Sequence, residues 1–163
     1  MYSVNVPVPP AVQRLAGELA PSLAAFDSVR DEFSLVAKRL ESADPAVEKR
    51  VRRELRDAPA FEARVARVGT FTEPTGGPGP VVYLDVESPG LRAVHERLAS
   101  VVDPVGGVEG TDYTPHVTLA RGGGEDAAER LDGRSVGPVT WTVTELALYD
   151  ARHGERWGRV PLG

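Results

Sequence analysis

The triplet His116-Val117-Thr118 is the place in the sequence where side-chain types and spacing could do chemistry. In an extended strand alternate residues face the same side, so His116 and Thr118 would point one way while Val117 and Leu119 point into a core. Imidazole can take or give a proton near neutral pH, and a threonine hydroxyl can donate a hydrogen bond to an anionic oxygen. Beside a cleft, this pair predicts acid–base chemistry on an anionic substrate.

The composition restricts the alternatives to this chemistry. The 163 residues include three His and no Cys, which excludes thiol nucleophiles, disulfide scaffolds and zinc ribbons and leaves too few ligands for a histidine-rich metal site. The hydrophobic share of 41% indicates a globular domain. No apolar run approaches the roughly 18 residues of a membrane span and no secretion signal follows Met1, so we expect a cytoplasmic protein. The net charge of −5 argues against binding long duplex nucleic acid.

Hydrophobic periodicity predicts the strands and helices that must position this triplet. Strands are expected over residues 2–8, 33–37, 61–71, 81–86 and 116–121, and a closing antiparallel hairpin over 139–149 and 156–162. Helices are expected after the prolines at positions 10, 45 and 89, because proline is tolerated in the first turn, and a short helix over 125–131. The second helix carries basic residues that could be solvated or contact phosphate: Lys49, Arg50, Arg52, Arg53 and Arg56.

The order of these elements occurs twice along the chain. Pro10 falls on Pro89 at an offset of 79, and the segment 33–35 falls on 117–119 at an offset of 84. Two copies of one unit predict a single α+β domain over residues 1–163 with two antiparallel-sheet lobes, helices outside and a central cleft. We expect the first repeat to cover about residues 1–72 and the second about 80–163, with terminal strands that the lobes could exchange.

The segment around the triplet and the end of the chain resemble the 2H phosphoesterase superfamily, also called the RNA 2',3'-cyclic phosphodiesterase or 2'-5' RNA ligase family. Residues 113–121 (YTPHVTLAR) are similar to its second His-x-Thr motif, and residues 146–150 and 157–160 to its closing hairpin. The resemblance implies one histidine from each lobe: one acts as a base on water or a hydroxyl, and the other protonates the leaving oxygen. It further implies no metal or cofactor, an RNA end or small nucleotide phosphodiester as ligand, and a monomer.

The first motif departs from that pattern. At the offset of 84, Glu32 stands at the position of the first histidine, and Ser34 keeps the hydroxyl. A carboxylate can act as a base if desolvation raises its pKa, but it is a poor acid at neutral pH and repels phosphate. Three outcomes stay open: Glu32 as a surrogate base, reduced activity with retained ligand binding, or a different chemistry. The expected catalytic set is His116, Thr118, Ser34 and Glu32.

Basic and aromatic residues near the two motifs are candidate substrate contacts. Arg121, Lys38 and Arg39 follow the motif strands and could bind phosphate or simply be solvated. Tyr113 offers an aromatic edge just before His116.

The remaining aromatic and histidine candidates have plainer alternatives. Tyr149 and Trp157 could stack a base, although packing is the simpler interpretation. We expect His95 to be a half-exposed helix residue and His153 to be a turn residue.

Overall fold

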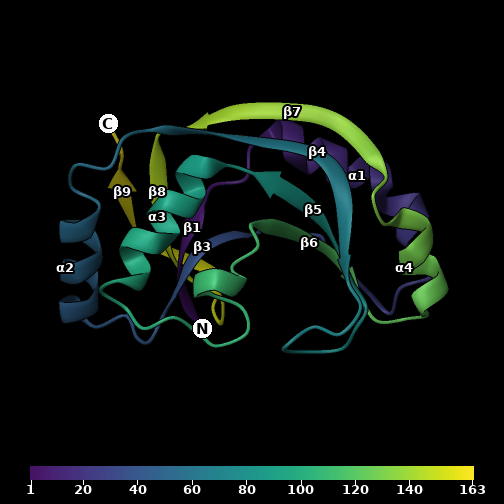
Figure 1. The fold of residues 1–163 in the computed structure, drawn as a ribbon, viewed down its shortest axis with the longest axis horizontal. Coiled ribbons are helices and arrows are strands. Elements are labelled where there is room, and N and C mark those ends of the chain that lie inside the picture. The colour runs from purple at the N-terminus through teal and green to yellow at the C-terminus, as the bar shows by residue number, and fades with distance from the viewer.

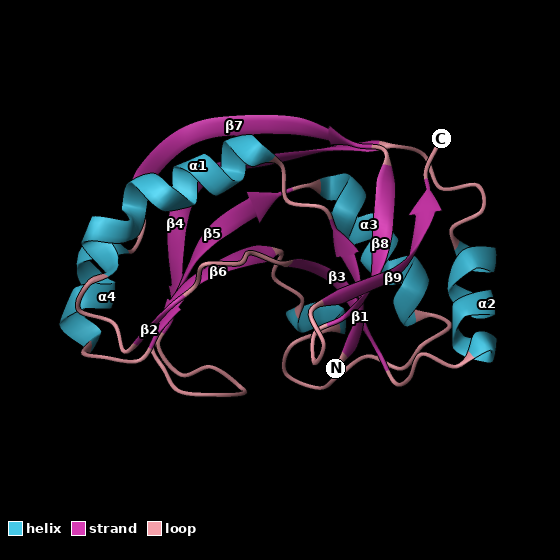
Figure 2. Cartoon of the chain, turned by 180° about the vertical axis from the view of Figure 1, so that it is seen from behind, coloured by secondary structure: helices cyan, strands magenta, loops and turns pink.

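A computed structural model describes all 163 residues as an α+β fold with nine strands (Figures 1 and 2). The strands are β1 (Tyr2–Val6), β2 (Ser28–Val29), β3 (Leu35–Leu40), β4 (Phe61–Phe71), β5 (Val81–Glu87), β6 (His116–Arg121), β7 (Ser135–Val143), β8 (Glu145–Asp150) and β9 (Glu155–Pro161). The α-helices are α1 (Pro10–Leu19), α2 (Pro45–Glu54), α3 (Pro89–Ala99) and α4 (Glu125–Leu131), with 3₁₀ turns η1 (Ala20–Leu23) and η2 (Gly110–Asp112).

The three long helices begin where the sequence predicts. Each has proline in its first turn, where the missing N–H costs no helical hydrogen bond. At α3 the Ser88 hydroxyl also accepts a hydrogen bond from Leu91 N at 3.1 Å. The buried residues of α1 and α3 recur at helical spacing, so each helix buries one stripe against the sheet.

All strand pairs are antiparallel, in the order β7-β4-β5-β6-β3-β1-β8-β9, with β2 added on β6. The two central strands, β3 and β6, meet at a single residue pair, Leu35 and Val117. Four strands of this order lie on each side of the contact, and the two halves exchange equivalent strands. β4 leaves the first repeat to pair with β5, and β8 leaves the second repeat to pair with β1.

Strand register corrects the offset of 84 expected for the motif strands. Leu35, not Phe33, lies opposite Val117, so the two motif strands are related by an offset of 82. The pairs on the other side of each motif strand give the same offset. Lys38 of β3 pairs with Val4 of β1, and Ala120 of β6, which is 82 residues further on, pairs with Val82 of β5. The same irregularity follows in both halves, where Ala37 and Leu119 are each skipped by the partner strand as a β-bulge. Position 34 is therefore the counterpart of position 116, and position 36 of position 118.

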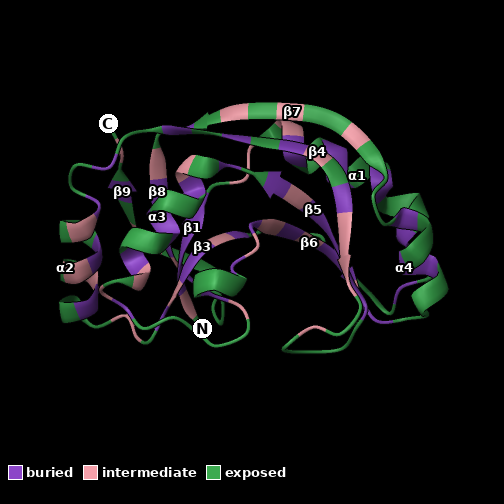
Figure 3. Cartoon of the chain, viewed as in Figure 1, coloured by how far each residue is buried: buried purple, intermediate pink, exposed green.

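The core lies between the sheet and the helices. Its members include Leu35, Val117 and Leu119, whereas His116 and Thr118 are half-buried on the opposite side of β6. The helices likewise have a buried and an exposed side (Figure 3). The alternation expected for the triplet is therefore present. No helix is long and apolar enough to cross a membrane.

Some predicted boundaries differ from the structure. The strand expected from residue 33 begins at Leu35, and the closing hairpin is formed by β8 and β9 alone. Residues 139–143 belong instead to β7, which pairs with β4 at the opposite edge of the sheet. An alternating strand pattern does not by itself say which strand a segment pairs with.

Candidate functional site

The His116 ring is fixed in one orientation at the start of β6. Its Nδ1 lies 2.6 Å from the carbonyl oxygen of Thr114, and since a carbonyl can only accept, Nδ1 carries the proton in this bond. The rings of Phe71 and Tyr83 contact the imidazole edge to face, each with a centroid separation of 5.2 Å. Nε2 has no hydrogen-bond partner in the protein, so its lone pair is available to a ligand.

The surroundings of His116 keep its imidazole neutral at neutral pH. Burial lowers the pKa of His116, the nearby charges of Arg39 and Arg121 lower it further, and the Thr114 carbonyl and Asp85 oppose them. A neutral imidazole whose Nδ1 donates to a carbonyl presents Nε2 as a base. Thr118 lies two residues along the strand and adds a hydroxyl to the same face of β6.

The opposite half of the site lacks a histidine. By the observed register the counterpart of His116 is Ser34, which is exposed, and the counterpart of Thr118 is Val36, which is half-buried. The interpretation of Glu32 as the replaced histidine is wrong, because Glu32 lies two residues before Ser34, in a bend that precedes β3. One side of the site therefore offers an imidazole and a hydroxyl, and the other offers a hydroxyl and an aliphatic side chain.

Two arginines occupy equivalent positions on the site face. Arg39 and Arg121 each follow a bulge, which turns them onto the face of His116, and both are half-buried. Arg121 Nη1 donates to Gly76 O at 2.9 Å. Burial lowers the pKa of Arg121, and so do the charges of Arg30 and Arg39.

Arg30 is absent from the candidates that the sequence predicts. Its backbone N–H donates to Leu119 O at 2.8 Å, which holds it beside β6. None of Arg30, Arg39 and Arg121 forms an ion pair with a carboxylate. Three guanidinium groups without a counter-charge favour an anion at this place. Only the pairing of residues 28–29 with β6 places Arg30 here.

The sequence predicts a substrate contact for Lys38, but the structure places it in the core. Its side chain is fully buried, and Nζ donates to Glu109 Oε1 at 2.7 Å and to two backbone carbonyls. Burial alone would raise the pKa of Glu109, but hydrogen bonds from Arg39 N, Lys38 and Val105 N lower it overall. Lys38 therefore anchors the loop before η2 to β3. The bulge at Ala37 is the physical reason, since it turns Lys38 inward and Arg39 outward.

Tyr113, which the sequence predicts as a substrate contact, also lies in the core. It is buried, its hydroxyl donates to Val36 O at 2.8 Å, and its ring stacks on His95 with centroids 3.8 Å apart. Burial raises the pKa of Tyr113, which keeps the hydroxyl protonated.

His95 is buried rather than half-exposed. Its Nδ1 is 2.7 Å from Ala37 O, and its Nε2 accepts from Gly110 N at 2.9 Å. These two partners require a neutral ring, so His95 and Tyr113 together support β3 from the core side.

The last candidates lie around β8 and β9. His153 is an exposed turn residue whose Nδ1 lies 2.6 Å from Asp150 Oδ2, and this hydrogen bond raises the pKa of His153. Trp157 packs against the core. Tyr149 is half-buried and pairs with Ser3, which itself pairs with Arg39, so Tyr149 shares the site face.

Solved structures of other proteins share this architecture. Crystal structures of E. coli LigT with NADP+ and of TT0787 of Thermus thermophilus are each 22% identical to the chain, with TM-scores of 0.71 and 0.61. The alignments cover 99% of this chain and 96% and 97% of those chains. E. coli LigT with 3'-AMP has 21% identity and a TM-score of 0.66 over 99% of this chain and 94% of that one.

A family model also matches the chain at the level of sequence. No curated protein sequence matches the chain. The family model described as the 2'-5' RNA ligase superfamily matches residues 22–155, which include both motif strands and most of the chain. The chain therefore belongs to the 2'-5' RNA ligase superfamily of 2H phosphoesterases.

Proposed function

We propose that the chain is a metal-independent phosphoesterase that acts on a nucleotide phosphodiester, such as a 2',3'-cyclic phosphate at an RNA end. The observation that carries the proposal is the free Nε2 of a fixed, neutral His116 with Arg39 and Arg121 close enough to affect its pKa. A general base must have its lone pair exposed at the reacting atom, and a phosphoryl group needs positive charge around its oxygens.

The reaction follows from these groups. His116 Nε2 takes a proton from a water molecule, the water oxygen bonds to phosphorus, and one ring P–O bond breaks to leave a phosphomonoester. Thr118 and the guanidiniums of Arg39 and Arg121 hold the non-bridging oxygens, whose charge increases in the transition state. Ser34 supplies a second hydroxyl from the start of β3. The leaving oxygen receives its proton from solvent, because the counterpart of His116 in the other half is a serine rather than an acid.

A second candidate, nucleotide binding without turnover, is favoured by Ser34 and Val36 in the positions of a second His-x-Thr motif. Losing one acid–base partner lowers a rate by about 10²–10⁴, so the basic site could retain a nucleotide while hydrolysing it very slowly. Solved structures of E. coli LigT contain NADP+ or 3'-AMP. These ligands support a small phosphorylated nucleotide as the ligand of this chain.

Hydrolysis and binding measured together separate the candidates. We expect the wild type to hydrolyse adenosine 2',3'-cyclic phosphate and His116→Ala to lose this turnover, with 3'-AMP binding in both by calorimetry. Binding without turnover in the wild type would support the second candidate. Neither binding nor turnover, or equal turnover in wild type and His116→Ala, would refute the assignment of this site.

A further inference from the structure

The side of the site that belongs to β1 carries an amide whose hydrogen-bond donors are unused. Asn5 is 7% exposed, and its neighbours Val4 and Val6 are buried in the core, so its side chain lies on the site face. Ser3 Oγ donates to Asn5 Oδ1 at 2.7 Å, whereas Nδ2 has no partner in the protein. The fully buried nitrogens without a partner belong to two tryptophans elsewhere, so Nδ2 of Asn5 reaches the open side of the sheet. Its two N–H groups are free to donate to a ligand.

Asn5 lies two strands away from His116. It pairs with Val36, and Val36 lies across from His116, next to the contact of Leu35 with Val117. Two interstrand spacings of about 4.8 Å separate the strands of Asn5 and His116, or roughly 10 Å. A single phosphoryl group within hydrogen-bond distance of His116 Nε2 does not span this separation. Asn5 therefore faces a different part of a bound nucleotide.

The two halves of the fold differ at this position. Asn5 pairs with Val36, and Tyr83 pairs in the same way with Thr118, so Tyr83 is the counterpart of Asn5. The Tyr83 ring contacts the imidazole of His116 edge to face. The second half thus supports its histidine with an aromatic ring, whereas the first half presents a free amide at the equivalent place.

Tyr149 is the aromatic residue next to this amide. The pairing of β8 with β1 and of β4 with β5 makes Tyr149 the counterpart of Phe71. The Phe71 ring contacts that of Tyr83, with the centroids 4.3 Å apart, but Tyr149 has no aromatic neighbour because position 5 holds asparagine. A base can stack on an aromatic side chain whatever its sequence identity, so Tyr149 can hold a base without selecting one.

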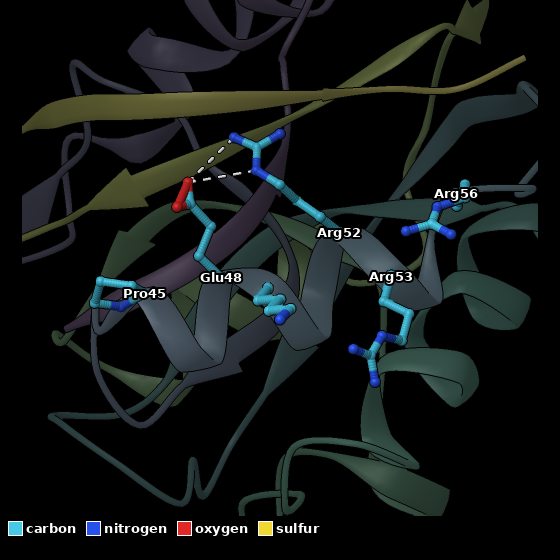
Figure 4. Close-up of a pocket in the computed structure, with 6 residues that line it drawn as sticks. Pro45, Glu48, Arg52, Arg53 and Arg56 are labelled. Carbon is cyan, nitrogen blue, oxygen red and sulfur yellow. Dashed lines mark hydrogen bonds and ion pairs between the residues drawn. The ribbon is translucent and has the colours of Figure 1, made fainter.

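The basic side chains of α2 do not extend the site. A hollow on this helix is lined by several of them, Arg52 and Arg53 included (Figure 4). A Cβ at Gly158 would lie 3.1 Å from both the Arg52 guanidinium and Leu148, a core residue, so Arg52 lies on the core face of β9. A nucleotide bound in the site must therefore make its further contacts on the site face itself.

We propose that Asn5 selects the base of the bound nucleotide and favours a base with a keto oxygen, such as guanine, hypoxanthine or uracil, over one with an amino group. The base lies against Tyr149 with its polar edge toward Asn5. Because Oδ1 is held by Ser3, the amide presents its two N–H groups, which pair with a keto oxygen or a ring nitrogen. The amino group of adenine or cytosine would set donor against donor. The inference rests on the proposed function for the phosphate at His116.

Binding of 3'-IMP and 3'-AMP, measured by calorimetry, tests this selection. Their bases have the same size and differ only at position 6, keto or amino, and at the adjacent N1. The wild type should bind 3'-IMP about 5- to 150-fold more tightly, because the donor is paired in one complex and faces another donor in the other. Ribose 3-phosphate, which has no base, reports on the phosphate and sugar contacts alone.

Two variants of Asn5 and one control sharpen the test. Asn5→Asp keeps the shape of the side chain and an acceptor for Ser3 but replaces the free donors by an acceptor, so the preference should invert toward 3'-AMP. Asn5→Ala should bring the ratio of the two affinities to about one. Gln13→Glu makes the same change of amide to carboxylate at an exposed position of α1 and should keep the wild-type ratio. A ratio within one protein cancels any general effect of the added charge on phosphate.

Three outcomes would overturn the inference: equal affinities of the wild type for 3'-IMP and 3'-AMP, tighter binding of 3'-AMP, or an equal loss of 3'-IMP and ribose 3-phosphate affinity in Asn5→Ala. The last result would assign Asn5 to the phosphate or the sugar. Failure of the proposed function has a different signature. Turnover of inosine 2',3'-cyclic phosphate would then not depend on His116, while selection between the two nucleotides by Asn5 would still be measurable.

Discussion

Replacing Ser34 by histidine should create the missing acid. The register places residue 34, immediately before β3, in the position that corresponds to 116. Ser34 is exposed, so the larger side chain should change stability by no more than about 0.5 kcal/mol. A positioned general acid is worth about 10²–10⁴ in rate, or about 3–5 kcal/mol of activation free energy.

The assay is hydrolysis of adenosine 2',3'-cyclic phosphate, followed as a function of pH. Ser34→His should raise kcat by about 10²–10⁴ and introduce a falling limb at high pH, because the new imidazole must be protonated to act. Glu32→His is the matched control, since it adds the same side chain two residues earlier, outside the site. A larger gain from Glu32→His than from Ser34→His would refute the register and the mechanism built on it.

Three further predictions concern groups whose surroundings the structure defines. Since the pKa of His116 is lowered, kcat/KM should rise with pH about a midpoint below the ordinary imidazole pKa of 6.5, and a midpoint at or above 6.5 would contradict this. Arg39→Ala and Arg121→Ala should each weaken 3'-AMP binding about 10- to 150-fold in calorimetry, which corresponds to the loss of one charge-assisted hydrogen bond. Arg14→Ala, at an exposed position of α1, should leave this affinity unchanged. Lys38→Met should lower the free energy of unfolding in urea by about 3–5 kcal/mol, because it leaves the buried Glu109 carboxylate unpaired. Combining Lys38→Met with Glu109→Gln should recover part of that loss.

Much of the fold can be predicted from the sequence because its signals are local. Proline at helix starts and alternation along β4 and β6 identify the elements within a few residues. The repeat can also be recognised in the sequence, but the offset between its two motif strands cannot. Offsets of 82 and 84 are both even, so each keeps the same residues inside, and the likeness of Ser34 to Thr118 favours the wrong one. The matching bulges at Ala37 and Leu119, together with the contact of Leu35 with Val117, distinguish the two.

The sequence predicts the candidate site only in part, for a related reason. Strict alternation from Ser34 would put Lys38 on the site face and Arg39 in the core, and the bulge at Ala37 reverses both. Nothing in the neighbouring residues marks that bulge. The burial of His95 and Tyr113 likewise depends on partners in β3, far away in the sequence, such as Ala37 and Val36.

The exchange of β4 and β8 between the halves has a consequence for how such a chain could arise. A single repeat on its own lacks a strand of its half-sheet and regains it only from a second copy, so one repeat would exist as a strand-swapped homodimer. The dimer axis would pass through the contact that Leu35 and Val117 now make. Such a dimer must carry the same side chain at both motif positions. A single chain that contains both copies is free of that constraint, and a serine in the position equivalent to a histidine is a difference that only such a chain can encode.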